Sequence, residues 1–228
     1  MSEKSNFFIE RCYIKYVKKI YFKVTRIHLG KDKMTDLANG LVTGDGTKVL
    51  NVEEYDKFVL CIPKRCKTIF ELDTITGMRY VEVQRLYENP KWYSESRNQI
   101  ILPPEAQKKE KQKLVKRTID KLPTTFPYIF EKFINGKEPP ERSSWNRDLA
   151  RWSLKADIDP KVGPKTPRKT IESWMLKAGI PEIEIYSRQG HDPVTSLKHY
   201  QSLSFTDYEM RDINKRLTEW GMLSRINA

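Results

Sequence analysis

The sequence predicts a mainly α-helical protein with a small antiparallel β-sheet, an α+β fold. Apolar residues recur at three- and four-residue spacing in most segments after residue 50, which is typical of helices that bury one face. Two short apolar runs, 98–103 and 114–122, flank a lysine-rich stretch and predict a hairpin. Capping residues and glycines mark where several of the helices begin and end.

The segment before residue 50 is basic and carries aromatic residues between lysines. Residues 1–33 contain nine Lys/Arg and three Asp/Glu, and alternation over 23–29 suggests a strand. Such a segment suits a DNA-contacting arm or, equally, an edge strand with one solvated face. Gly44, Asp45 and Gly46 then predict a tight turn, and we place a boundary near residue 50.

Three helices are predicted next, at 52–64, 67–75 and 78–87, and Thr76 and Gly77 separate the second from the third. After the hairpin, short helices are expected at 127–135 and 145–154. A polar stretch with prolines, 157–167, leads to a helix at 170–179. Its apolar residues share one face, Gly179 ends it and Pro181 follows, as is common beyond a helix C-terminus.

The C-terminal region predicts two more helices. Asp192 and Pro193 form an N-cap and first-turn pair, and a last helix begins at a capping box over 206–209 and ends at Gly221. The expected domains are a basic N-terminal arm or DNA-contacting element at 1–50, a catalytic domain at 51–222 and a tail at 223–228.

The charge balance favours a polyanionic partner. There are 42 Lys+Arg against 30 Asp+Glu, a net charge of +12. A field of this sign attracts nucleic acid first and an acidic membrane surface second, although a charged surface that only confers solubility is the alternative. The three cysteines form no CxxC pair, no apolar run approaches the length of a membrane span, and no signal-peptide pattern is seen, so a cytoplasmic, DNA-associated protein is expected.

Phosphodiester transfer without a metal needs a nucleophile, cations on the non-bridging oxygens, an acid for the leaving group and a partner for the nucleophile's proton. Arginine suits the cationic role because its planar fork meets two phosphate oxygens and stays protonated. The three histidines, His28, His191 and His199, form no metal-ligand motif. Phosphate chemistry in this chain is therefore expected to depend on arginine, with no metal, cofactor or small-molecule substrate.

Four sequence elements resemble the motifs of the tyrosine recombinase (phage integrase) family. The segment 76–86, TGMRYVEVQRL, resembles the "TGLRxxEL" box, and 165–170, KTPRKT, stands where that family has "HxLRHT". The segment 188–192, RQGHD, is similar to the "LGH" element, and Tyr200 has the position of the nucleophile. The order of the four elements and their spacing carry the resemblance, which covers roughly residues 50–222 and implies the family's catalytic-domain fold.

The resemblance implies specific roles. Arg79 and Arg168 would hold the scissile phosphate, and His191, 23 residues after Arg168, would hydrogen-bond it. Tyr200, nine residues further on, would attack phosphorus and form a 3′-phosphotyrosine with a free 5′ hydroxyl. Because that bond conserves the energy of the phosphodiester, no ATP would be needed. The implied activity is site-specific recombination or integration of double-stranded DNA.

Two positions depart from the family pattern. Lys165 replaces the first histidine of the "HxLRHT" box; it can donate to a phosphate but is a poor base near neutral pH, and it resembles integrases of archaeal viruses and plasmids. The general-acid lysine is expected on the hairpin, where Lys111 fits best by spacing and Lys109 second. A solvated loop is the alternative for the other lysines of the hairpin.

The last helix has two interpretations: it docks on its own domain, or it passes to a neighbouring subunit and links a tetramer on DNA, which the resemblance favours slightly. Members of the family that the chain resembles typically carry a separate helical DNA-binding domain before the catalytic domain, whereas only about fifty residues precede it here. This part is therefore expected to be a reduced or truncated DNA-binding element. The competing functions are relaxation of DNA by a type IB topoisomerase-like enzyme and DNA binding by a recombinase that has lost catalysis.

Overall fold

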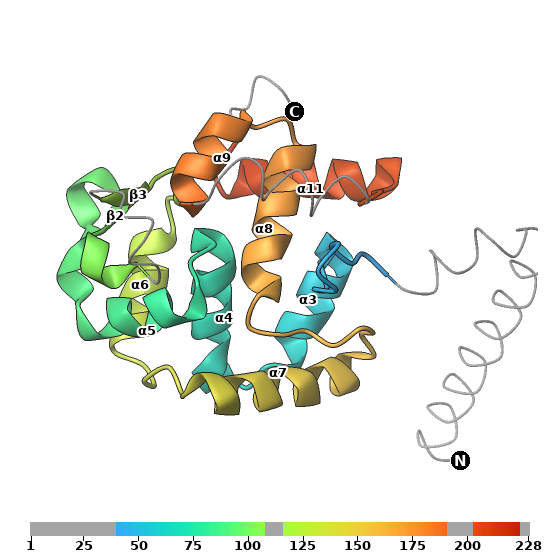
Figure 1. Cartoon of the computed structure of the whole chain (residues 1–228), viewed down its shortest axis with the longest axis horizontal. Coiled ribbons are helices and arrows are strands. Elements are labelled where there is room, and N and C mark those ends of the chain that lie inside the picture. The colour runs from blue at the N-terminus through green and yellow to red at the C-terminus, as the bar shows by residue number, and fades with distance from the viewer. Residues whose placement is uncertain (1–39, 108–115, 191–202, 224–228) are drawn as a thin grey trace, which may run out of the picture. The chain divides into compact units, whose positions relative to one another are not determined.

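The computed structural model describes residues 40–107, 116–190 and 203–223. The helices in this part of the chain are α3 (Val52–Cys61), α4 (Lys64–Thr76), α5 (Tyr80–Glu88), α6 (Phe126–Ile134), α7 (Arg142–Ala156), α8 (Thr166–Lys177), α9 (Glu182–Gln189) and α11 (Asp207–Glu219) (Figure 1). Together with one small sheet they confirm the predicted mainly helical α+β class.

The sheet has three antiparallel strands in the order β1 (Tyr93–Ser94), β2 (Gln99–Leu102) and β3 (Arg117–Ile119). The predicted hairpin is confirmed, since β2 pairs directly with β3, with Ile100 opposite Ile119. The two-residue strand β1 was not predicted because it is too short to show alternation.

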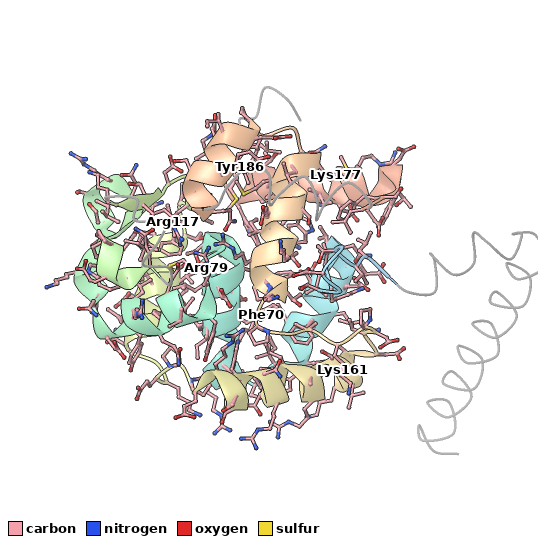
Figure 2. All side chains as sticks on the ribbon, viewed as in Figure 1. Phe70, Arg79, Arg117, Lys161, Lys177 and Tyr186 are labelled. Carbon is pink, nitrogen blue, oxygen red and sulfur yellow. The ribbon has the colours of Figure 1, made fainter. Side chains whose placement is uncertain are left out.

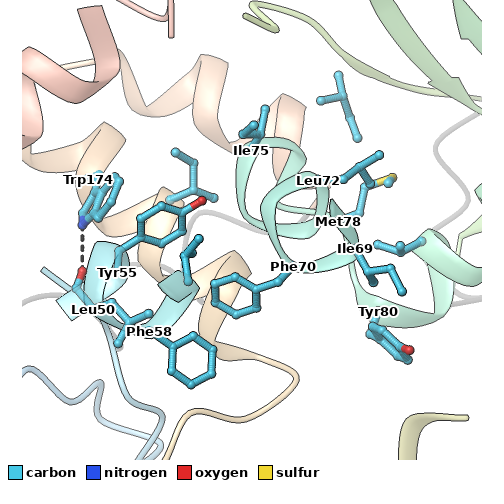
Figure 3. Packing of buried hydrophobic residues seen from close by; sticks show 14 of the residues in the cluster. Leu50, Tyr55, Phe58, Ile69, Phe70, Leu72, Ile75, Met78, Tyr80 and Trp174 are labelled. Carbon is cyan, nitrogen blue, oxygen red and sulfur yellow. Dashed lines mark hydrogen bonds between the residues drawn. The ribbon is translucent and has the colours of Figure 1, made fainter. Parts of the chain in front are cut away.

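The core lies between α3, α4, α7 and α8 and is built largely from aromatic side chains (Figure 3). Tyr55 of α3 stacks on Phe70 of α4 and meets the edge of Trp174 of α8, with ring centroids 6.0 and 5.8 Å apart. Burying each such ring contributes roughly 1.5–3 kcal/mol. This packing fixes α4 and α8 side by side, and these are the helices that carry the site described below.

Residues 41–50 contact α8. The turn predicted at 44–46 is present, with the Gly46 N–H donating to the Thr43 carbonyl. The Leu50 N–H donates to the Thr170 hydroxyl at 3.0 Å, and its carbonyl accepts from the indole of Trp174 at 2.8 Å (Figure 3). The proposed division of the chain at residue 50 stays a prediction.

Helix α11 begins at the predicted capping box, in which Thr206 and Glu209 bond reciprocally. Its Ile213 and Leu217 are fully buried, and Trp220 at its end packs on Tyr55 and Trp174 of the same chain. The geometry thus places α11 on its own domain, against α3 and α8.

Helix α9 was not predicted. Its sequence, EIEIYSRQ, alternates like a strand, but one isoleucine, Ile183, is 73% exposed and the other, Ile185, is fully buried. The buried face instead combines Ile185, Tyr186 and Gln189, which is helical spacing. The predicted strand at 23–29 and the helix at Asp192 lie outside the described residues. No described helix is both long and apolar enough to span a bilayer.

Candidate active site

The turn after α4 sets the position of Arg79. Gly77 ends α4 with φ of 61°, a left-handed conformation that favours glycine, and its N–H donates to the Asp73 carbonyl. A Cβ at Gly77 would lie 2.3 Å from the end of the Gln189 side chain, which would have to shift to admit a larger residue. The chain then turns immediately, and Arg79 becomes the N-cap residue of α5.

Glu82 joins two arginines in a buried network. Its carboxylate is fully buried and accepts from the Arg79 guanidinium at 3.0 Å and from the Arg79 backbone N–H at 2.8 Å. Arg117 of β3 approaches from the other side and donates to both carboxylate oxygens, at 2.6 and 3.2 Å. Figure 2 shows Arg79 and Arg117 close to the junction of α4, α5 and β3.

The network holds Glu82 in its charged form. Burial alone would raise the pKa of Glu82, but the attraction and hydrogen bonds of Arg117, followed by Arg168 and Arg79, outweigh burial and lower it. A charged carboxylate shared between two guanidinium groups fixes both, because each fork loses its freedom to rotate away. The side chain of Arg79 remains 21% exposed, so one part of it still faces outward.

Arg168, in the first turn of α8, is held by backbone carbonyls. Its two terminal nitrogens donate to Gly77 at 2.7 Å and to Gln189 at 2.6 Å. No described carboxylate accepts a hydrogen bond from it. Burial and the positive charges of Arg79 and Arg117 lower its pKa to about 10, so it remains charged at neutral pH.

The end of α9 is fixed by the same arginines. The Gln189 carbonyl accepts from both Arg168 and Arg117, the latter at 3.2 Å. Gly190 follows with φ of 63°, and a Cβ there would lie 2.6 Å from the Arg117 side chain. The chain therefore leaves α9 from a fixed point, one residue before His191.

Asp73 contrasts with Glu82. It is also fully buried, but neither of its oxygens has a hydrogen-bond partner among the described residues. Burial raises the pKa of Asp73 well above its usual value, and the attraction of Arg168 offsets this only in part. The attraction of Glu172 and Glu82 offsets part of the positive charge of Arg168. The three guanidinium groups of Arg79, Arg117 and Arg168 together suit an anion.

Lys165 lies beside the site, immediately before α8. Its ammonium is 3.3 Å from a carboxylate oxygen of Asp45, in the turn at 44–46. Burial would raise the pKa of Asp45, but hydrogen bonds from Thr43 and Thr47 and the charge of Lys165 lower it far below its usual range. The lysine is therefore paired with an acid in this structure, although its side chain is 61% exposed.

Replacing Asp45 with asparagine should strengthen DNA binding, because the change releases Lys165 and removes a negative charge beside the arginines. We expect the Kd for duplex DNA to fall about two- to fivefold at low salt, the range for an exposed ion pair, and the gain to shrink as salt rises. Fluorescence anisotropy with labelled duplex would measure it. Asp212→Asn on α11 is the matched control, and unchanged or weaker binding by Asp45→Asn would contradict the placement of Lys165 at a phosphate site.

Three of the seven predicted site residues can be placed. Arg79, Lys165 and Arg168 lie within the described residues. Glu82 orients Arg79, and Arg168 donates to the carbonyl of Gly77, two residues before Arg79. Lys109, Lys111, His191 and Tyr200 lie outside the described residues. Within residues 40–107, 116–190 and 203–223, no group of histidine, cysteine or acidic side chains is arranged to hold a metal ion.

Sequence reasoning missed the structural roles of several arginines, among them Arg117 and Arg85. Arg117 was treated only as part of a strand; its place two residues before the buried Ile119, on the same face, was the signal that it is buried and needs a partner. Arg85 of α5 donates to the carbonyls of Glu105, Ala106 and Gln107, directly before the lysine-rich segment. Nothing in the sequence pattern indicates that contact.

No protein-family model matches the chain, and no curated protein is significantly similar to it in sequence. Its structure is similar to that of the XerH site-specific recombinase. In a post-cleavage complex of XerH with a palindromic difH substrate, the TM-score is 0.51 at 16% identity, over 75% of this chain and 53% of that one. A pre-cleavage complex of XerH with difH gives a TM-score of 0.49 at 16% identity, over 72% and 52%.

The chain thus spans about half the length of the XerH chains. At this identity the likeness concerns the fold alone: the described part has a mainly helical α+β fold similar to that of the XerH site-specific recombinase.

Proposed function

We propose that this protein is a site-specific DNA recombinase that cleaves and rejoins DNA through a 3′-phosphotyrosine at Tyr200. The observation that carries the proposal is the fixed pair Arg79 and Arg168, on a fold shared with a site-specific recombinase. Both guanidinium groups are oriented by acceptors within the protein before any ligand arrives. Preorganised cations of this kind stabilise the charge that develops on phosphorus oxygens in the transition state.

In the proposed reaction, the Tyr200 oxygen attacks the scissile phosphorus and releases its proton to solvent water, while Arg79 and Arg168 bind the non-bridging oxygens of the phosphate. His191 donates a hydrogen bond to the same phosphate. Lys165 attracts the phosphate as a point charge and does not act as a base. The 5′ oxygen leaves with a proton from Lys111 or Lys109. A 5′ hydroxyl from a second strand then attacks the phosphotyrosine, which restores the phosphodiester and frees Tyr200.

The surroundings of Arg168 agree with this assignment. A cation in the first turn of α8 faces the positive end of the helix dipole, which is unfavourable in the free protein. A bound phosphate would interact favourably with both the Arg168 guanidinium and the N-terminus of α8, because anions bind well at helix N-termini. The carbonyls of Gly77 and Gln189 hold the guanidinium in place until then.

The chemistry requires more than one subunit only for strand exchange, not for cleavage. A tetramer on DNA linked through the C-terminal helix stays a prediction, whereas the packing of Ile213 and Leu217 within one chain favours a helix that stays on its own domain. Subunit contacts would then involve other surfaces. The proposed origin in an archaeal mobile element and the integration of a viral genome rest on the sequence resemblance alone.

A suicide-substrate assay tests the proposal. A duplex with a nick or a bridging phosphorothiolate near the cleaved step should trap a covalent protein–DNA band on a denaturing gel, and Tyr200→Phe should abolish it. Tyr208→Phe is the matched control, since Tyr208 is exposed on α11. A band that persists in Tyr200→Phe would reject Tyr200 as nucleophile. Tight binding with no band on any duplex would favour a protein that binds DNA without cleaving it.

A further inference from the structure

A basic groove lies between the start of α4 and helix α6. Its volume is about 580 Å³, and its floor is apolar, formed in part by Ile69, Ile129 and Phe133. The rim is positively charged, with cations contributed by α4 and by α6 and the turn after it. These cations are Lys64, Arg65, Lys67, Lys132 and Lys137.

The positive charge of the groove is largely uncompensated. Glu71 is the one acid that lines it, and its carboxylate is 3.8 Å from Lys67. The other four cations form no ion pair with a described residue. Lys132 instead lies over the ring of Tyr128, 4.1 Å from the centroid, and that ring is 59% exposed. The ring attracts the ammonium group but does not neutralise its charge.

The local structure of α4 adds to this imbalance. The helix begins after Pro63 with no side-chain cap and no acidic residue in its first turn. Lys64, Arg65 and Lys67 all lie in that turn, at the positive end of the helix dipole. Both features are unfavourable in the free protein and would be relieved by an anion seated in the groove.

The groove is distinct from the arginine site. Helix α4 has Lys64 at one end and Gly77 directly after the other, 13 residues apart. At 1.5 Å per residue the two ends are separated by about 20 Å. Duplex DNA rises 3.4 Å for each phosphate along a strand, so a duplex bound at the arginines reaches that far within about six base pairs.

We propose that this groove binds the phosphate backbone of the DNA duplex held at the arginine site, about six base pairs from the cleaved step. The inference rests on the proposed function, since it takes DNA as the ligand. The groove supplies affinity and orientation, not sequence discrimination, because lysine and arginine contacts to phosphate read the backbone alone.

The test is a triple variant, Lys64→Gln, Arg65→Gln and Lys132→Gln, with the triple Arg151→Gln, Lys155→Gln and Lys161→Gln as a control of equal charge change outside the groove. Anisotropy measures binding to a duplex of about 30 base pairs and to one of about 8, whose ends extend only about 14 Å from its centre. All six residues are exposed, so both variants are expected to fold, and unfolding curves would check this.

On the long duplex, the groove variant should bind about tenfold more weakly than wild type at 0.1 M salt, and the slope of log K against log salt should become shallower by about two to three. On the short duplex it should match the control. Equal loss on both duplexes, or no loss on the long one, would overturn the inference. Lost binding to polyglutamate with unchanged DNA binding would assign the groove to an acidic protein instead.

The two proposals fail in different ways. If wild-type protein binds neither duplex, the proposed function fails. If wild type binds and cleaves DNA and the groove variant binds DNA as tightly as wild type, then the groove has no part in DNA binding and the proposed function stands.

Discussion

Arg168→Lys should reduce the rate of covalent complex formation by about 10²–10³-fold, the usual cost of removing one oriented donor from a transition state. Lysine keeps the positive charge but cannot reach the Gly77 and Gln189 carbonyls and a phosphate together, because it lacks the planar fork. Duplex affinity should change less than tenfold, since total charge is unchanged. Single-turnover cleavage of a suicide substrate separates the two quantities.

Arg151→Lys is the matched control for this experiment. Arg151 is an exposed residue of α7 whose one described ion pair is with Asp148. Its replacement should leave both cleavage and binding as in wild type. A cleavage rate in Arg168→Lys within about threefold of wild type would show that this arginine does not contact the reacting phosphate.

Glu82→Gln should cost about 3–5 kcal/mol of the free energy of unfolding, because it removes the one carboxylate shared by Arg79 and the buried Arg117. For a chain of this size the melting temperature would fall by about 6–20 °C. Cleavage should fall as well, since Arg79 would lose its orienting partner. Thermal unfolding followed by circular dichroism measures the first effect.

The stability supplied by Glu82 should depend on pH in one direction. Its folded-state pKa lies below the ordinary 4.5, so the contribution is complete above about pH 4.5 and is lost as pH falls through the folded value. Glu71→Gln is the control, since Glu71 has a single ion pair at 3.8 Å and should change the free energy of unfolding by less than about 1 kcal/mol. Equal effects of the two substitutions would contradict the role given to Glu82.

Much of the fold could be predicted because local patterns and packing agree. The capping box at Thr206, the glycines after α4 and α11 and the apolar face of α8 each carry a local signal that the structure uses. Helix α9 could not be predicted in this way. Its two isoleucines have opposite burial, and the face that turns inward is decided by the packing of α9 against α8 and β3, which are distant in sequence.

The sequence could propose candidate site residues but not the contacts that hold them. Motif spacing singles out Arg79 and Arg168 as candidates, and their role in a site stays a prediction, whereas their orientation depends on Glu82, Arg117 and the Gln189 carbonyl. A backbone acceptor has no sequence signature, because every residue carries a carbonyl. The pairing of Lys165 with Asp45 joins positions 120 residues apart, which no local pattern indicates.

The most direct test of the account is to identify the residue that becomes attached to DNA. Wild-type protein would be trapped on a suicide substrate, digested with trypsin and nuclease, and the nucleotide-bearing peptide sequenced by mass spectrometry. The account predicts one modified residue, Tyr200, with the phosphate linked to the 3′ end of the cleaved strand. Attachment to another residue, linkage through a 5′ phosphate, or cleavage without any adduct would contradict it.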